Sequence, residues 1–248
     1  MTDRQKIWVL IGACAFIIGA VFVFIDPVAQ NLGYHHFSDG RNWLGIDNFG
    51  DVVSNALFVP AGLYGLWALS KRTFEPTRIP LAVFFIGVIF VAPGSAYYHV
   101  NPTNWTLLWD RLPMSVAFMG LTAAILTDRV NARFGVRVAL PALIVLGAVS
   151  VVYWYMTEIA QAGDLRAYGL VQYLPMAMIP VMLWLFPKVS TLGWRALGSM
   201  FVFYALAKAL EHYDHQVMTQ LGGVVSGHTL KHLFAAMAPI ALGVHLRR

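Results

Sequence analysis

Residues 80–99 read PLAVFFIGVIFVAPGSAYYH, and this stretch decides the class of fold. It contains no Lys, Arg, Asp or Glu. A helix needs about 20 mainly apolar residues to cross the roughly 30 Å hydrocarbon core of a bilayer. The stretch is therefore predicted to be a transmembrane helix, and its last residues, GSAYYH, place polar side chains at one end of that helix.

The rest of the chain has the same apolar character. Of its 248 residues 58% are hydrophobic and 12% are charged, and the mean hydropathy is +0.64. These values exclude an ordinary soluble domain. We predict an all-α polytopic bundle that forms a single membrane domain, residues 1–248. Its eight transmembrane helices are expected at 7–25, 52–70, 80–99, 111–127, 138–155, 168–186, 196–213 and 229–246.

Positive charge in the loops predicts how these helices are oriented. Lys and Arg accumulate in short cytoplasmic loops, and 12 of the 17 basic residues fall in alternate loops and near the chain ends. Both termini are therefore predicted to be cytoplasmic. The net charge of +5 comes largely from these loops, so it does not indicate nucleic-acid binding. The basic set comprises Arg4, Lys6, Lys71, Arg72, Arg78, Arg129, Arg133, Arg137, Lys188, Arg195, Arg247 and Arg248.

The first apolar stretch, 7–25, allows two interpretations. Arg4 and Lys6 precede it, as basic residues precede the apolar region of a signal peptide. The stretch is long for such a region, however, and no clear small-x-small cleavage site follows it. We favour a retained helix, outside the seven helices of 52–246.

Three polar clusters lie at helix ends that this topology brings to the outer side of the membrane. GSAYYH (94–99) ends the third helix, WDRLPM (109–114) begins the fourth, and SGHTLKH (226–232) begins the eighth. Ionisable side chains are costly inside a membrane, so they are candidates for function. The clusters bring His99, Asp110, His228 and His232 to one depth.

The spacing of the histidines predicts a metal site. His228 and His232 are four residues apart and share one helix face. Two histidines at this spacing can bind one metal ion, as in HExxH metalloproteases, and a third histidine, His99, completes a three-ligand zinc site. Three protein ligands leave one coordination position open, which is typical of a catalytic zinc. Ser95 shares a helix face with His99, and together with Asp110 it favours zinc and water chemistry.

Two alternatives to a zinc hydrolase stay open. Paired histidines on facing helices also bind haem in membrane b-type cytochromes, although the polar Ser95 and Asp110 fit a haem pocket poorly. A non-catalytic receptor or transporter could use the same zinc ion structurally. The haem alternative predicts a Soret band, and the receptor alternative predicts metal binding without a released product.

At these residues the chain resembles the alkaline ceramidases, a family within the CREST superfamily of membrane hydrolases and adiponectin-receptor-like proteins. The resemblance covers roughly residues 39–240. It rests on NFGDVVSN (48–55), GSxxYH (94–99), DRLPM (110–114) and HxxxH (228–232). It implies a seven-helix core, so that 7–25 is an additional N-terminal helix.

The resemblance also implies roles for the residues. His99, His228 and His232 would be zinc ligands, Asp110 the residue that moves the proton, and Ser95 a stabiliser of the oxyanion. The expected reaction hydrolyses the N-acyl bond of a ceramide-like lipid to a fatty acid and a long-chain base. The short loops favour a bacterial plasma membrane, and no particular oligomeric state is predicted.

The family's calcium site lies in an acidic segment before the first core helix. Here the comparable stretch offers Asp39, Asn42, Asn48 and Asp51 as oxygen ligands suited to calcium. Asn48 stands where the family has a Glu, which changes the charge of the set. A calcium site and a plain solvated loop are both consistent with this stretch.

Charged residues also lie in the outer half of the seventh helix. Lys208 and Glu211 are spaced as neighbours on a helix face, and Asp214 follows them. They predict either a buried ion pair or an arrangement in which Glu211 or Asp214 accepts the ring N–H of a zinc-bound histidine. Lys231, between the two paired histidines, is expected to point away from them.

Overall fold

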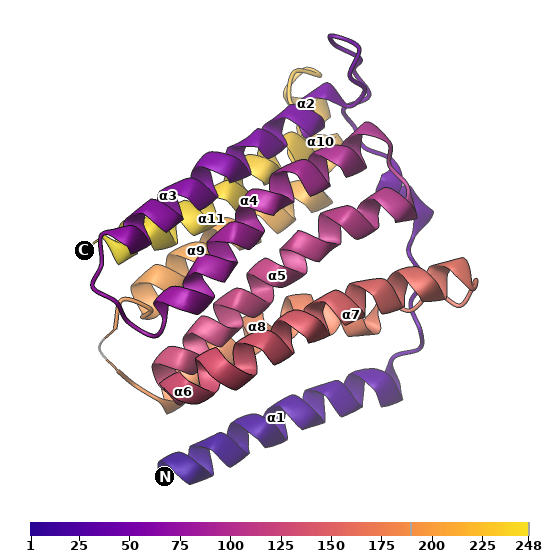
Figure 1. The fold of residues 1–248 in the computed structure, drawn as a ribbon. Helices are drawn as coiled ribbons and strands as arrows, with labels where there is room; N and C mark the ends of the chain where they lie inside the picture. The colour runs from indigo at the N-terminus through magenta and orange to yellow at the C-terminus, as the bar shows by residue number, and fades with distance from the viewer. Residues whose placement is uncertain (189, 248) are drawn as a thin grey trace. The chain divides into compact units, whose positions relative to one another are not determined.

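The computed structural model describes residues 1–188 and 190–247. The chain is 78% helical and the described residues form no strand, which confirms the all-α prediction. Arg248, the last member of the basic set, lies outside the described residues. The helical segments (Figure 1) are, in chain order, α1 (Asp3–Phe24), η1 (Leu32–His35), α2 (Phe49–Ser54), η2 (Asn55–Leu57), α3 (Phe58–Ser70), α4 (Arg78–Val100), α5 (Asn104–Arg129), α6 (Ala132–Phe134), η3 (Gly135–Ala139), α7 (Leu140–Ile159), α8 (Arg166–Leu185), α9 (Trp194–His212), α10 (Asp214–Gln220) and α11 (Gly227–Leu246).

Six helical segments of the described chain are long and apolar enough to cross a membrane. They match six of the predicted spans. The other two predicted spans, 111–127 and 196–213, are helical in α5 and, as far as His212, in α9, but charged residues such as Arg111 and Lys208 make these helices less apolar. The count of eight spans therefore stays a prediction. The six segments are Asp3–Phe24, Phe49–Ser70, Arg78–Val100, Ala132–Ile159, Arg166–Leu185 and Gly227–Leu246.

The chain divides into two compact units. Helices α4 and α5 each contribute residues to both units, and the prediction of one membrane domain stays a prediction. The first unit comprises Met1–Gln30, Phe74–Phe84 and Ser115–Trp194, and the second comprises Asn31–Thr73, Phe85–Met114 and Arg195–Arg248.

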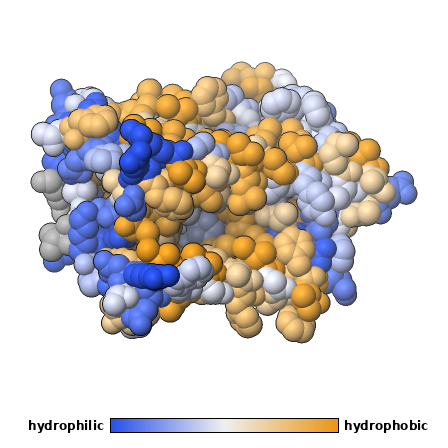
Figure 2. All heavy atoms as spheres, turned by 60° about the horizontal axis from the view of Figure 1, so that its bottom comes forward, coloured by the Kyte–Doolittle hydropathy of each residue, from blue (hydrophilic) through white to orange (hydrophobic). Residues whose placement is uncertain are grey.

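In the first unit, α1 packs against α8, and the segment that follows α1 is hydrogen-bonded to the start of α8. The Arg166 guanidinium donates a hydrogen bond of 2.8 Å to the Ile25 carbonyl oxygen, and the Leu165 N–H donates one of 2.8 Å to the Val28 carbonyl oxygen. Large side chains of α1, such as Phe24, remain exposed. Apolar side chains also cover much of the face drawn in Figure 2, as suits a protein whose solvent is lipid.

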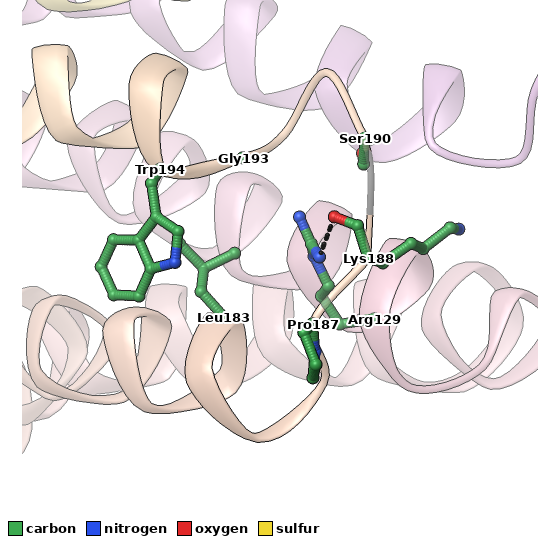
Figure 3. Close-up of a pocket in the computed structure, with 7 residues that line it drawn as sticks. All are labelled: Arg129, Leu183, Pro187, Lys188, Ser190, Gly193 and Trp194. Carbon is green, nitrogen blue, oxygen red and sulfur yellow. Dashed lines mark hydrogen bonds between the residues drawn. The ribbon is translucent and has the colours of Figure 1, made fainter.

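A cavity of about 470 Å³ lies beside the loop between α8 and α9 (Figure 3). The buried Arg129 guanidinium holds this loop, since it donates hydrogen bonds of 2.9 Å to the Lys188 carbonyl oxygen and 2.8 Å to the Leu192 carbonyl oxygen. The cavity is therefore a feature of loop anchoring. Its lining residues are Arg129, Leu183, Pro187, Lys188, Ser190, Gly193 and Trp194.

In the second unit, α11 is the helix on which the others assemble. It packs along α3 and also contacts α2 and α10. At its C-terminal end, the Arg72 guanidinium donates a 2.9 Å hydrogen bond to the Leu246 carbonyl oxygen. The N-terminal end of α11 carries the polar cluster that the sequence singled out.

Candidate metal centre

Three histidine rings of the second unit meet in a closed triangle. His99 lies in the last turn of α4, and His228 and His232 lie one turn apart on α11. The ring centroids are 4.7 Å apart for His99 and His228, and 5.0 Å apart for each of the other two pairs. All three residues are buried, and one ring nitrogen from each lies within 4.8 Å of the others. The three side chains could therefore hold one metal ion.

Several ring nitrogens in this triangle lack a hydrogen-bond partner. Among the described residues, both nitrogens of His99 and Nε2 of His232 are buried with no hydrogen-bond partner. An unsatisfied buried polar atom costs about 1–3 kcal/mol, so such atoms in a native fold call for an explanation. A metal ion bound between the rings would engage one nitrogen of each ring, including Nε2 of His232 and one of the two His99 nitrogens, and three imidazole nitrogens are a donor set compatible with zinc. The residues present therefore fit the ion that the sequence predicted.

Ser95 and Asp110 form a buried pair where α4 and α5 approach each other. Ser95 lies one turn before His99, and its side chain interacts with the Asp110 carboxyl. A Cβ atom at Gly94 would overlap the carbonyl oxygen of Trp109, so glycine is needed for this close approach. The structure thus places a hydroxyl on the helix that carries His99 and a carboxylate on the neighbouring helix.

The first turn of α11 is held by two buried carboxylates. Asp214 Oδ1 accepts a 2.8 Å hydrogen bond from the backbone N–H of His228. Asp51 Oδ1 accepts hydrogen bonds of 2.7 Å from Ser226 Oγ and 2.6 Å from Thr229 Oγ1. Negative charge at a helix N-terminus is favourable because of the helix dipole. The backbone that carries His228 and His232 is therefore fixed from α2 and from α10.

Glu211 bridges two lysines in place of contacting a histidine ring. It is paired with Lys208 on its own helix, and its Oε1 lies 2.8 Å from Lys231 Nζ. Among the described hydrogen bonds, neither Glu211 nor Asp214 accepts from a ring nitrogen of the three histidines. Lys208 and Glu211 thus form the predicted ion pair.

The expectation that Lys231 points away from the histidines was wrong. Lys231 Nζ lies 3.0 Å from Nε2 of His228. Helical side chains tilt toward the N-terminus of their helix, so a long side chain covers the residue three positions earlier. Lys231 also interacts electrostatically with Asp110. The ammonium group is therefore a part of the histidine cluster that helical periodicity alone did not place there.

The four residues proposed for calcium lie in separate hydrogen-bond groups. Asp39 is bound by the Arg41 guanidinium at 2.6 and 2.9 Å and by the Gly50 N–H at 2.8 Å. Burial alone would raise the pKa of the Asp39 carboxyl, but these hydrogen bonds outweigh it and hold that pKa below its ordinary value. The other three residues have partners of their own: Asn42 binds Asp47, Asn48 donates to the His99 carbonyl oxygen, and Asp51 binds Ser226 and Thr229.

Two residues at the cluster were missed by the sequence reasoning. The Phe37 ring lies edge-on against His99 and His228, with centroids 4.5 and 4.7 Å away. Ser54 Oγ lies 2.7 Å from Nδ1 of His232. Phe37 has no signal in the sequence, but Ser54 lies in the NFGDVVSN stretch, where a polar face in an apolar helix could have indicated it.

Comparison with known protein families agrees with this arrangement of residues. A family model described as Ceramidase matches residues 46–246. The chain belongs to the ceramidase family. The match confirms the resemblance to alkaline ceramidases, and it begins about seven residues and ends about six residues later than the sequence motifs indicated. No curated protein matches the chain. Membership of the ceramidase family implies a hydrolase that acts on amide bonds and a lipid substrate.

Proposed function

We propose that this ceramidase-family protein is a zinc-dependent membrane amidase. It hydrolyses the N-acyl bond of ceramide-like sphingolipids and releases a fatty acid and a long-chain base. The triangle of buried histidine rings with unpartnered nitrogens carries the proposal, because soluble and membrane cores do not leave such atoms unsatisfied without cause. The family match supports an amide bond as the bond that is cleaved and a lipid as the substrate.

The metal is assigned to His99, His228 and His232. When bound there, zinc would polarise the amide carbonyl and lower the pKa of an attacking water. The ring of His232 is held by Ser54, and the backbone that carries His228 is held by Asp214. Rigid ligands keep the ion in one position relative to the reacting bond.

Asp110 is assigned the proton transfers, and Ser95 the stabilisation of the oxyanion. The Asp110 carboxylate takes a proton from water as the water oxygen forms its bond to the carbonyl carbon. It then passes this proton to the amide nitrogen as the carbon–nitrogen bond breaks, so that the amine can leave. The Ser95 hydroxyl interacts with the carboxylate and helps to orient it. It can also turn about its Cβ–Oγ bond and donate to the carbonyl oxygen as negative charge develops there.

The membrane arrangement is part of the proposal. We place α5 and α9 across the membrane with the six more apolar segments, which makes eight spans in one membrane domain, residues 1–248. The loop charges support cytoplasmic termini and a site that opens toward the outer face. A bacterial plasma membrane is the proposed location.

The geometry favours zinc over haem. Two axial histidines must lie on opposite faces of a macrocycle, whereas these three rings contact one another edge to face at interplanar angles of 61–85°. Calcium at Asp39, Asn42, Asn48 and Asp51 is the weaker metal candidate, because the Arg41 cation lies against both oxygens of Asp39.

The test is metal analysis combined with product detection on the full chain purified in detergent. Wild-type protein and His228→Ala are incubated with a long-chain ceramide, and the fatty acid and long-chain base are measured by mass spectrometry. Wild type should contain one zinc per chain and release both products in equal amounts, and a chelator should stop this until zinc is restored. Zinc without products from any N-acyl lipid would favour the receptor alternative, and a Soret band would favour haem.

A further inference from the structure

We propose that Ser54 is a positioning residue that fixes the ring of His232 with Nε2 turned toward the metal. Ser54 ends α2 and lies on the far side of the His232 ring from the triangle's unpartnered nitrogen, since its Oγ contacts Nδ1 at 2.7 Å while Nε2 is buried without a partner. The inference rests on the proposed metal centre and not on the identity of the lipid substrate.

The hydrogen-bond chain defines the tautomer. Ser54 Oγ donates to the Asp51 carbonyl oxygen at 3.2 Å, so the hydroxyl hydrogen is committed to the backbone. The oxygen then faces Nδ1 of His232 as an acceptor, and Nδ1 must carry the ring hydrogen. Nε2 consequently keeps its lone pair, which is the form that binds a metal ion.

The backbone around Ser54 keeps this geometry in place. The Asp51 carbonyl oxygen also lies within hydrogen-bonding reach of His232, and Asn55 Nδ2 donates to the same oxygen at 2.7 Å. The Asp51 carboxylate binds Ser226 and Thr229 at the start of α11. The Asp51 side chain thus fastens α2 to the start of the helix of His232, three residues before Ser54, and keeps the hydroxyl against the ring in one register.

The other polar groups near the centre do not replace Ser54. Glu211 is engaged by Lys208 and Lys231, and Asp214 accepts from backbone N–H groups. The remaining ring neighbour of His232 on the α2–α3 run is the apolar Phe58, whose centroid lies 6.0 Å away. Metal-binding histidines usually donate their second ring N–H to a carboxylate or a carbonyl. Here the Ser54 hydroxyl takes the place of that acceptor, and it donates in turn to the Asp51 carbonyl oxygen.

The test compares metal binding by full-length wild type, Ser54→Ala and Ser54→Thr in detergent. Zn²⁺ affinity is measured by competition with a chelating dye, and Co²⁺ loading is followed by its visible absorption spectrum. Ser54→Ala should weaken Zn²⁺ binding on the order of 10-fold, the lower end of the usual range because the Asp51 carbonyl remains, and should alter the Co²⁺ spectrum. Ser54→Thr, which keeps the hydroxyl, should restore both.

The matched control is Ser150→Ala. Ser150 is also a helical serine that donates to a carbonyl oxygen three residues earlier, at 2.7 Å from Gly147, but it touches no histidine. Its substitution should leave both metal readouts unchanged. Equal Zn²⁺ affinity and equal Co²⁺ spectra for wild type and Ser54→Ala would overturn the positioning role alone, and so would a folded Ser54→Thr that binds no better than Ser54→Ala. A wild type that binds neither ion would overturn the proposed metal centre as well.

Discussion

The ammonium of Lys231 lies 3.0 Å from Nε2 of His228, one turn earlier on α11. A cation at this distance from a ring nitrogen of the histidine cluster opposes the binding of a divalent ion by direct repulsion. Glu211 lowers that repulsion, because its Oε1 lies 2.8 Å from the same ammonium. The charge beside the metal centre is therefore set by two side chains that are not ligands.

Lys231→Met should tighten Zn²⁺ binding by roughly 3- to 10-fold, since it removes the nearer charge while keeping the length of the side chain. Dye competition measures the affinity. Lys188→Met is the control, because Lys188 pairs with the Asp128 carboxylate in the first unit, whereas the histidine cluster lies in the second. A weaker affinity in Lys231→Met would mean that Lys231 supports the ligand ring more than it repels the ion.

His99→Ala should reduce the metal content of the purified protein from about one zinc per chain to near zero. Two imidazoles four residues apart leave the ion without the third ligand that a stable site requires. His245→Ala is the control, since His245 lies in the last turn of α11, the helix that also carries two of the proposed ligands. Elemental analysis after dialysis distinguishes the two variants, and full occupancy in His99→Ala would remove His99 from the ligand set.

Asp110→Asn should keep its zinc and lose about 100- to 10,000-fold in turnover, because the amide cannot accept the proton from water. Asp128→Asn provides the comparison on the opposite end of α5, where the carboxylate pairs with Lys188 and Arg129. Ceramide turnover is measured at matched zinc content. Wild-type turnover in Asp110→Asn would assign the proton transfer to another group.

The helices and the meeting of the histidines could be predicted because both depend on local patterns. Apolar stretches of membrane length mark the spans, and an i, i+4 spacing places His228 and His232 on one face whatever surrounds them. Because successive loops lie on opposite sides of the membrane, the C-terminal end of α4 is expected on the same side as the N-terminal end of α11. No detail of packing enters these steps.

The partners of the histidines could not be predicted in the same way. Ser54 reaches His232 only because α2 lies against the first turn of α11, and Phe37 reaches two rings only because of the path of its loop. Lys231 depends on a rotamer that bends back along its helix. Each of these contacts follows from tertiary packing or side-chain direction, which hydropathy and spacing do not encode.

Gly94→Ala should destabilise the fold by about 1–3 kcal/mol, because the added Cβ meets the Trp109 carbonyl oxygen and forces α4 and α5 apart. The same shift should separate Ser95 from Asp110 and lower turnover. Gly198→Ala in α9 is the control, since its Cβ has no atom within 4 Å and alanine favours a helix by about 0.5–1 kcal/mol. Denaturant titration in detergent compares them. Equal stabilities would show that α4 can move without cost.

Asp164 makes a pH-dependent contribution to the stability of the first unit. Hydrogen bonds from the Arg166 side chain hold the pKa of Asp164 at about 2, below its ordinary value of 3.8. A carboxyl whose pKa is lowered by folding stabilises the fold fully above the ordinary value, and this contribution disappears as the pH falls through the lowered one. Asp164→Asn should therefore lower Tm by on the order of a few degrees at neutral pH, and the difference from wild type should shrink between about pH 4 and pH 2.

Asp3→Asn, which alters an exposed ion pair with Lys6, should change Tm little at any pH. Thermal unfolding in detergent across this range is the measurement, and a difference for Asp164→Asn that persists unchanged at pH 2 would contradict the role of its ionised form.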